Sequence, residues 1–392
     1  MPRLRLLEVS GTPFEMGRQH AAAYSKEIQE LTKDRLSLSS DKNWTGKELS
    51  RQEVLALGQA CLPYHEAYAP ELMDELRGLS AGVGLSVTEL MILNGFTDFV
   101  DTIYCADEQR FRSLSGTPGD FREITPSQSS HQFPPVPTVV PAHPAADDCT
   151  AFIVSPEIAA ESQGFLGQTW DMHETATPYL ILLRGKPEAA LRFLAFTIIG
   201  CIGMIGMNEA GIAVGINNLV AGDGRPGVTW PFVVRKILAQ DNLDDALACI
   251  TQAKLAGGHN YLLADSTGRG YNVEAMASRY HVQEVKTGAW VHTNHCLIAH
   301  NIHVERARLP RSRASSETRL NRGKELLNQT GITWADLMSL TRDHSAINGI
   351  CVHPEEPFYL ESCGAALMRP ATREFRAVWG RPCENDYESF VV

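Results

Sequence analysis

The chain has 392 residues, and its 46 acidic against 35 basic side chains give a formal charge of −11. This excess of acid, without any run of Lys or Arg, argues against a nucleic-acid-binding surface. With 44% hydrophobic and 21% charged residues, the composition is that of a folded globular protein. The sequence contains no stretch of about 18 uninterrupted apolar residues, so no membrane span is predicted.

The nine cysteines are scattered and form no Cys-x-x-Cys pair, so neither a disulfide framework nor a thiolate zinc site is predicted. The glycines at 200, 203, 206 and 211 do not form a Gly-x-Gly-x-x-Gly motif after a strand, so no dinucleotide site is expected either. The sequence therefore predicts no cofactor and no metal. Its first residues lack an export signal, which makes a cytoplasmic location the default expectation.

Residues 1–104 are predicted to be a largely helical segment. Thr12-Pro13-Phe14-Glu15 has the cap, the proline and the acid that begin a helix. Further helical patterns cover roughly 47–61 and 69–80, and another helix opens at Ser86.

Residues 105–148 lack periodicity and are rich in Ser and Pro. Such a stretch cannot bury enough apolar surface to order itself, which predicts a flexible linker. It ends abruptly at Asp148-Cys149.

Residues 149–392 are predicted to form a second, β-rich domain of α+β class. Its expected strands are Cys149–Val154, Gly164–Trp170, Pro178–Arg184, Leu191–Thr197, Gly211–Asn218 and His259–Ala264. Its expected helices lie near 230–239, 243–254, 317–328 and 333–342.

Cys149 stands where the linker meets the first strand, and two interpretations are open for it. In the first interpretation, Cys149 is a small buried hydrophobic residue at the start of a strand. The other is a nucleophile: a cut just before Cys149 would place an α-amino group, with a reference pKa of about 8, on the same residue as the thiol. Asp171 ends a strand 22 residues later, an interval that fits a strand, a turn and a returning strand. Alone, Asp171 would be interpreted as a turn or cap residue.

Several short segments occur here in the order found in a known family. They are Asp-Cys-Thr-Ala-Phe at 148–152, Gly-Gln-Thr-Trp-Asp at 167–171, the glycine-rich 206–214, Ile-Asn-Asn-Leu at 216–219, and upstream 11–17 and 75–82. With these the chain resembles the acyl-coenzyme A:6-aminopenicillanic acid acyltransferase (isopenicillin N acyltransferase) family, a branch of the N-terminal nucleophile hydrolases.

The resemblance implies a four-layer αββα fold made as a precursor that cuts itself at Asp148–Cys149. The two fragments would stay associated. It also implies that Cys149 is nucleophile and base, that Asp171 supports its amino group, and that Asn217 is the oxyanion donor. Asn218 is the alternative to Asn217 if the register is shifted by one.

Supporting roles are expected for Thr150, Trp170 and Arg319. The family has a catalytic Arg near its C-terminus, but Cys363 stands at the closest match in this sequence. Either Arg319 or Arg322 takes that role, or the pocket recognises different substrates. The family often has Gly before the nucleophile, where this chain has Asp148.

A histidine group offers a rival mechanism. His292, His295, His300 and His303 lie within twelve residues, but nothing beyond Cys296 completes a recognisable metal site. A pair of Cys149 with His292 or His295, of thiol-protease type, would need no cleavage.

The sequence thus predicts a self-processing amidohydrolase that acts on a small-molecule amide or acyl donor through a thioester. Acyl transfer to an amine is the alternative, and a scaffold without cleavage is a third. The expected partners are this small molecule and the two fragments of the precursor, with no nucleic acid and no membrane. Nothing in the sequence excludes an oligomer.

Overall fold

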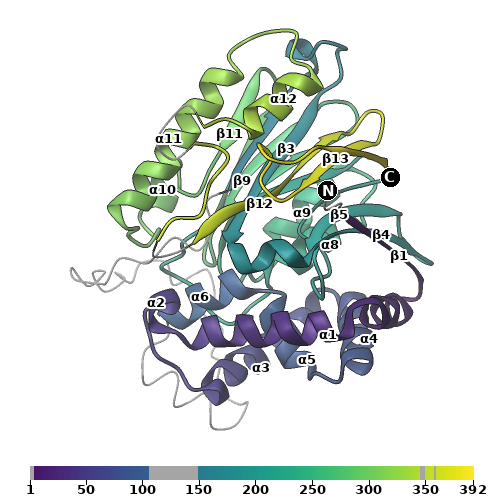
Figure 1. Cartoon of the computed structure of the whole chain (residues 1–392), viewed down its shortest axis with the longest axis vertical. Helices are drawn as coiled ribbons and strands as arrows, with labels where there is room; N and C mark the ends of the chain where they lie inside the picture. Colours follow the sequence, from purple (N-terminus) through teal and green to yellow (C-terminus); the bar gives the residue numbers. More distant parts are fainter. Residues whose placement is uncertain (1–3, 106–148, 345–348, 357–358) are drawn as a thin grey trace.

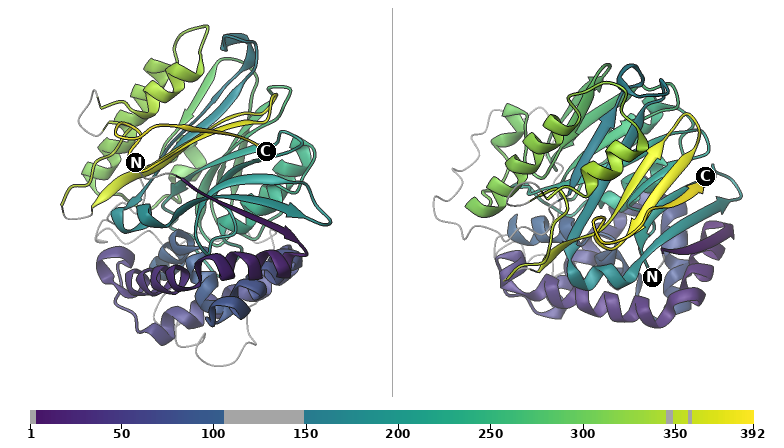
Figure 2. Two further views of the ribbon diagram at one scale, coloured as in Figure 1. Left: turned by 45° about the vertical axis from the view of Figure 1, so that its right-hand side comes forward. Right: turned by 45° about the horizontal axis from the view of Figure 1, so that its top comes forward.

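The computed structural model describes residues 4–105, 149–344, 349–356 and 359–392. In this part of the chain the strands form two sheets, which pack face to face through β2 and β3 of one sheet and β7 and β8 of the other. Helices cover both outer faces, and a group of N-terminal helices lies at one end of the layers (Figure 1, Figure 2).

The eight-stranded sheet has the order β1-β4-β5-β6-β7-β8-β9-β10. Its strands are β1 (Arg5–Gly11), β4 (Leu180–Pro187), β5 (Phe193–Ile198), β6 (Ile205–Asn208), β7 (Ala213–Leu219), β8 (Gly258–Ala264), β9 (Gly270–Ala275) and β10 (Tyr280–Val285). Neighbouring strands are antiparallel except β1 and β4, which are parallel. Helix α9 (Leu243–Thr251) packs on β8 and β9 of this sheet, and α8 (Trp230–Ile237) packs beside α9.

The six-stranded sheet has the order β11-β2-β3-β12-β13-β14. Its strands are β2 (Thr150–Val154), β3 (Phe165–His173), β11 (Ala289–His292), β12 (Leu360–Arg369), β13 (Glu374–Trp379) and β14 (Glu388–Val391). Helices α11 (Pro310–Leu326) and α12 (Trp334–Thr341) cover its outer face, and short α10 (Ala299–Ile302) precedes them (Figure 1). The 3₁₀ turns η2 (Pro156–Ile158) and η3 (Glu174–Tyr179) flank β3.

This arrangement confirms the four-layer αββα fold. Each of the six strands predicted after residue 148 has a counterpart, and so has each of the four predicted helices. The two predicted helix starts are confirmed, because Thr12 and Ser86 each form a complete capping box. Thr333 also forms a capping box, and the Asn242 side chain accepts the backbone N–H of Asp245. The sequence did not predict β1, β6 or any strand after β8.

The N-terminal segment contains the helices α1 (Pro13–Ser40), α2 (Lys42–Thr45), α3 (Arg51–Tyr68), α4 (Pro70–Val83), α5 (Val87–Leu93) and α6 (Phe96–Cys105). It is not helical throughout, because β1 joins the eight-stranded sheet, with Arg5 opposite Ile181. The predicted linker, apart from Cys105, lies outside the described residues, and so does Asp148.

Two glycines allow α1 and α4 to touch along their backbones. A Cβ on Gly17 would lie 2.0 Å from the carbonyl oxygen of Glu75, and one on Gly78 would lie 2.1 Å from that of Phe14. Any larger residue would force these helices apart, so both positions require glycine.

In the described residues no single helix is long and apolar enough to cross a bilayer. Helices α4 and α5 meet that length and composition only when they are taken together, and the pair is bent by 110°.

Two buried histidines join the N-terminal helices to the sheets. Nε2 of His65 on α3 accepts the backbone N–H of Thr229 at 3.0 Å, and Nε2 of His20 on α1 accepts that of Gly200 at 2.9 Å. A ring nitrogen that accepts such a bond carries no proton, so both imidazoles are neutral. Burial lowers the pKa of each to about 4.

We expect this contact to weaken as the pH falls from about 6.5 to about 4. In the unfolded chain each histidine takes up a proton near pH 6.5, whereas in the folded protein it does so only near pH 4. Between these two pH values each histidine therefore lowers the free energy of unfolding by on the order of 1.4 kcal/mol per pH unit, and below pH 4 it causes no further loss. His65→Gln keeps an acceptor without titrating. Its free energy of unfolding, measured in urea, should therefore fall less steeply with acid than that of the wild type. His300→Gln, a change at an exposed position, is the control, and equal slopes in all three proteins would contradict this prediction.

Candidate active site

Cys149 lies at the start of β2, against the end of the neighbouring strand. The antiparallel register pairs Thr150 with Thr169, so Trp170 and Asp171 return beside Cys149 as the 22-residue interval predicted. The Sγ atom is 3.9 Å from the carbonyl oxygen of Asp171. Cys149, Trp170 and Asp171 are all buried, with the thiol-bearing residue 1% exposed.

The Asp171 carboxylate is held by two hydroxyl groups. Ser362 donates to Oδ1 at 2.6 Å and Thr169 donates to Oδ2 at 3.5 Å. Ser362 stands directly opposite Asp171 on β12, and the pairing then shifts so that Gly364 faces Trp170. These two hydrogen bonds hold the Asp171 carboxyl group in place beside Cys149.

Asn217 approaches Cys149 from the other sheet. Its Nδ2 donates to the carbonyl oxygen of Cys149 at 3.1 Å. The two sheets are joined next to this contact, because the Gln168 side chain accepts the N–H of Ile216 at 2.7 Å and donates to its carbonyl oxygen. Successive side chains of a strand point to opposite faces, so Asn218 is directed away. This geometry favours Asn217 over Asn218 as the residue that contacts Cys149.

Arg319 of α11 reaches the same carbonyl oxygen from the outer helical layer. Its Nη1 donates to the oxygen of Cys149 at 2.8 Å and to Oγ1 of Thr150 at 3.0 Å, and its Nη2 donates to Oδ1 of Asn294 at 3.1 Å. The side chain is fully buried. Arg322, three residues on, instead pairs with Asp343 at 2.9 Å. Of the two arginines considered from the sequence, Arg319 is the one at the site.

Cys363 occupies the irregularity of β12 between Ser362 and Gly364. Its Sγ is 3.8 Å from the carbonyl oxygen of Met172 and 3.6 Å from that of Glu361. Burial raises the pKa of this thiol far above its usual range. Cys363, which the resemblance placed where an Arg was expected, is thus a buried thiol, while its neighbour Ser362 contacts Asp171. Ser362 was not among the predicted site residues, and its only signal in the sequence is its position directly before Cys363.

We expect Arg319→Lys to lower kcat/KM by about 100-fold, because lysine keeps the charge but cannot hold Cys149, Thr150 and Asn294 with one planar group. Arg322→Lys is the matched control on the same helix and should stay near wild type. Circular dichroism checks that both variants fold, and the rate of Cys149 alkylation reports whether the thiol is still positioned. Equal losses of kcat/KM in Arg319→Lys and Arg322→Lys would contradict the inference that Arg319 positions Cys149.

His292 and His295, the two candidates for a pair with Cys149, contact other residues. The ring nitrogens of His292 are 2.7 Å from the carbonyl oxygen of Thr293 and 3.1 Å from Oε1 of Glu274. His295 Nδ1 lies 2.6 Å from the hydroxyl of Ser316. Burial, followed by nearby positive charges, lowers the pKa of His295 to about 3. Both rings serve other partners, so the structure lends no support to a Cys–His pair.

A model of the acyl-coenzyme A:6-aminopenicillanic acid acyl-transferase family matches residues 158–382, more than half of the chain. The match includes Asp171, Asn217 and Arg319 and begins after Cys149.

Two relatives have similar sequences. An uncharacterized protein of Archaeoglobus fulgidus is 23% identical over 296 residues, which are 71% of this chain and 44% of that protein. The acyl-coenzyme A:6-aminopenicillanic-acid-acyltransferase 40 kDa form of Emericella nidulans is 24% identical over 293 residues, covering 74% and 69%. The chain therefore spans less than half the length of the archaeal relative.

Among solved structures, a mutant of the conjugated bile acid hydrolase from Clostridium perfringens superimposes with a TM-score of 0.42 at 10% identity, over 62% of this chain and 97% of that one. Penicillin V acylase from Agrobacterium tumefaciens gives 0.39 at 12% identity, over 62% and 86%. The family match, which extends over more than half of the residues, is the finding that assigns the protein. The chain belongs to the acyl-coenzyme A:6-aminopenicillanic acid acyl-transferase family.

Proposed function

We propose that this protein is a self-processing cysteine amidohydrolase whose nucleophile is Cys149. The observation that carries the proposal is the convergence of Asn217, from one sheet, and Arg319, from the outer helices, on the carbonyl group of Cys149. Two buried donors on one backbone oxygen fix the position of this residue with respect to both sheets. A core cysteine would need no such support, which favours the nucleophile over the buried hydrophobe.

The first reaction would be cleavage of the chain. In the uncut chain the nitrogen of Cys149 belongs to an amide and cannot act as a base. The thiol attacks the carbonyl carbon of Asp148, the S–C bond forms and the C–N bond breaks, and the released nitrogen takes up the proton. Water then hydrolyses the thioester, which regenerates the thiol and leaves a carboxylate on Asp148. The fragments 1–148 and 149–392 remain together.

Turnover would repeat this chemistry on a small amide. The new α-amino group accepts the thiol proton and the sulfur attacks the substrate carbonyl. The amine leaves with that proton, and water releases the acyl group as a carboxylate. Asp171, negatively charged and buried, balances the positive charge of the α-ammonium group. The Asn217 amide carries two hydrogens, so one holds the Cys149 carbonyl and the second is available for the substrate oxyanion.

Acyl transfer is the second candidate, and the family's description favours it. Both reactions share the thioester and differ in what attacks it. The family match does not identify the acyl group, so the substrate class stays an N-acyl amide or acyl thioester.

Intact-mass analysis of the purified protein tests the proposal. We expect two fragments, with Cys-Thr-Ala-Phe as the new N-terminus. The cut protein is then incubated with a panel of N-acyl amides and acyl-coenzyme A donors, with and without an added amine. Free acid as the product identifies hydrolysis, and an acylated amine identifies transfer. An uncut chain that turns over amides would overturn the self-processing mechanism.

A further inference from the structure

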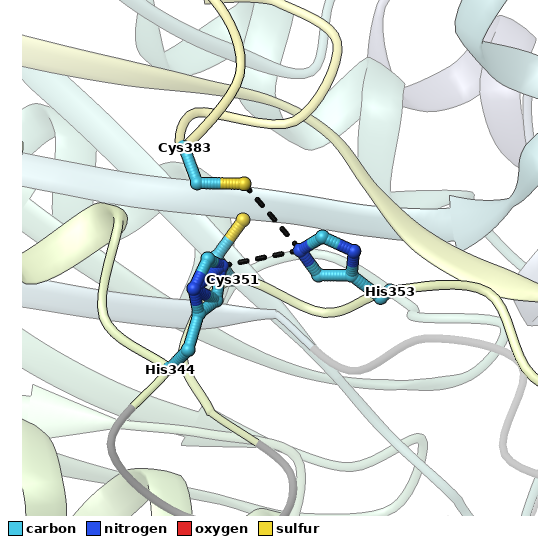
Figure 3. A group of neighbouring side chains, drawn as sticks. All are labelled: His344, Cys351, His353 and Cys383. Carbon is cyan, nitrogen blue, oxygen red and sulfur yellow. Dashed lines mark hydrogen bonds between the residues drawn. The ribbon is translucent and has the colours of Figure 1, made fainter.

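Four side chains with metal-binding atoms meet at a place separate from Cys149 (Figure 3). His344 follows α12, Cys351 and His353 lie on the segment that leads to β12, and Cys383 follows β13. Their ligand atoms all lie within 4.8 Å of one another. Three segments of the chain thus bring two thiols and two imidazoles to one point, although the sequence predicted no metal site.

The spacing of these atoms fits a tetrahedral metal. Nε2 of His353 is 3.1 Å from Nε2 of His344 and 3.4 Å from Sγ of Cys383. Around zinc, with bonds of about 2.0 Å to nitrogen and about 2.3 Å to sulfur, two nitrogens are about 3.3 Å apart and a nitrogen and a sulfur about 3.5 Å. Hydrogen bonds alone would require one imidazole nitrogen of His353 to serve both neighbours at once.

We propose that His344, Cys351, His353 and Cys383 bind a zinc ion. Thiolate and imidazole ligands select zinc over the hard cations Mg²⁺ and Ca²⁺. Two thiolates neutralise the ion's two positive charges, and the imidazoles bind in their neutral form. Because the protein supplies all four ligands, no position is left for a reacting water, and the site is structural.

The segments that carry the ligands are already held together by other bonds. The N–H of Cys351 donates to the carbonyl oxygen of Asp343 at 3.1 Å, beside His344. Arg342 donates to the carbonyl oxygens of Pro382 at 2.8 Å and Asn385 at 3.1 Å, on either side of Cys383. Zinc would therefore bind a largely preformed set of ligands.

The site is connected to Asp171 through Val352 and Ser362. Val352 lies between the ligands Cys351 and His353. Its N–H donates to the Ser362 hydroxyl at 2.9 Å, the Ser362 N–H donates to its carbonyl oxygen at 2.9 Å, and the same hydroxyl donates to Asp171 at 2.6 Å. Zinc would thus fix the segment that orients Ser362 toward the carboxylate.

Metal analysis of the purified full chain tests the proposal. Protein prepared in reducing buffer without chelator should contain about one zinc per chain by inductively coupled plasma mass spectrometry. His344→Ala changes an exposed side chain, so it should fold and lose most of the zinc, and Cys351→Ser with Cys383→Ser should lose all of it. Cys105→Ser and His300→Gln, which change residues outside the group, should retain it.

Reconstitution supplies a second readout. Chelator-treated wild type should melt at a lower temperature and recover with added Zn²⁺, and Co²⁺ should give the intense visible absorption of a tetrahedral site with thiolate charge-transfer bands. Cys149→Ala should bind the same zinc, so failure of the proposed catalysis and failure of this site are distinguishable. Absence of metal after reconstitution, a Cys351–Cys383 disulfide in the purified protein, or zinc retained by the double variant would each overturn the proposal.

Discussion

Cys149→Ala is expected to remain a single chain of 392 residues and to have no measurable amidase activity, whereas the wild type separates into two fragments on a denaturing gel. In the proposed mechanism the thiol attacks both the carbonyl carbon of Asp148 during cleavage of the chain and the carbonyl carbon of the substrate during turnover. No other group can therefore take over either step. Intact mass and a turnover assay with the best amide donor measure the two losses independently.

Two matched variants sharpen this result. Cys149→Ser keeps an attacking atom but a far less acidic one, and it should cut slowly over hours to days. Cys363→Ala removes a buried thiol that contacts two carbonyl groups of β-strand residues, and it should cut and turn over like the wild type. Cleavage in Cys149→Ala, or its loss in Cys363→Ala, would contradict the assignment of the nucleophile.

Asn217→Ala is expected to lower kcat by about 10²–10³-fold, equivalent to roughly 3 kcal/mol in the transition state, with a smaller change in KM. The loss falls on kcat because the amide hydrogen meets the substrate oxygen mainly once negative charge has developed on it. Self-cleavage passes through a similar oxyanion, so the variant should also accumulate uncut chain. Rates are therefore measured per cut molecule.

Asn218→Ala is the control for this position, since it alters the adjacent residue on the opposite face of β7. It should keep near-normal turnover. Asn217→Asp has the same shape but no donor and an added negative charge, so its rate should fall at least as far as that of Asn217→Ala. A loss of kcat in Asn218→Ala together with a normal kcat in Asn217→Ala would show that Asn218, and not Asn217, donates to the oxyanion.

Part of the candidate site could be predicted from local pattern, because Cys149 directly precedes β2 and Asp171 lies on β3, the next strand, which returns beside it. Asn217 lies on β7 of the other sheet, and only the family resemblance pointed to it. Arg319 could only be proposed beside Arg322, since both lie on α11 and the choice depends on which turn of the helix faces β2. Ser362 was missed because its contact with Asp171 spans 191 residues of sequence.

The missed strands have physical reasons as well. Strand β12 is buried along its whole length and carries Glu, Ser, Gly and Ala, so it shows neither alternation nor a high β-propensity. Each residue of strand β1 pairs with a residue of β4 that lies 176 positions later (Arg5 with Ile181), and several positions of β1 are partly or fully exposed. The metal-binding group was invisible to a search for closely spaced motifs, because Cys383 lies 30 residues from His353.

Strand β1 has a consequence for the cut protein. Residues 1–148 would supply the strand that covers β4, while residues 149–392 supply the rest of that sheet. After cleavage at Asp148–Cys149, unfolding would separate two molecules, and recovery would become a second-order reaction whose yield depends on protein concentration. The uncut precursor, by contrast, folds as one molecule at a rate independent of dilution. Comparing the refolding of Cys149→Ala with that of the wild type at several concentrations would reveal this change in reaction order.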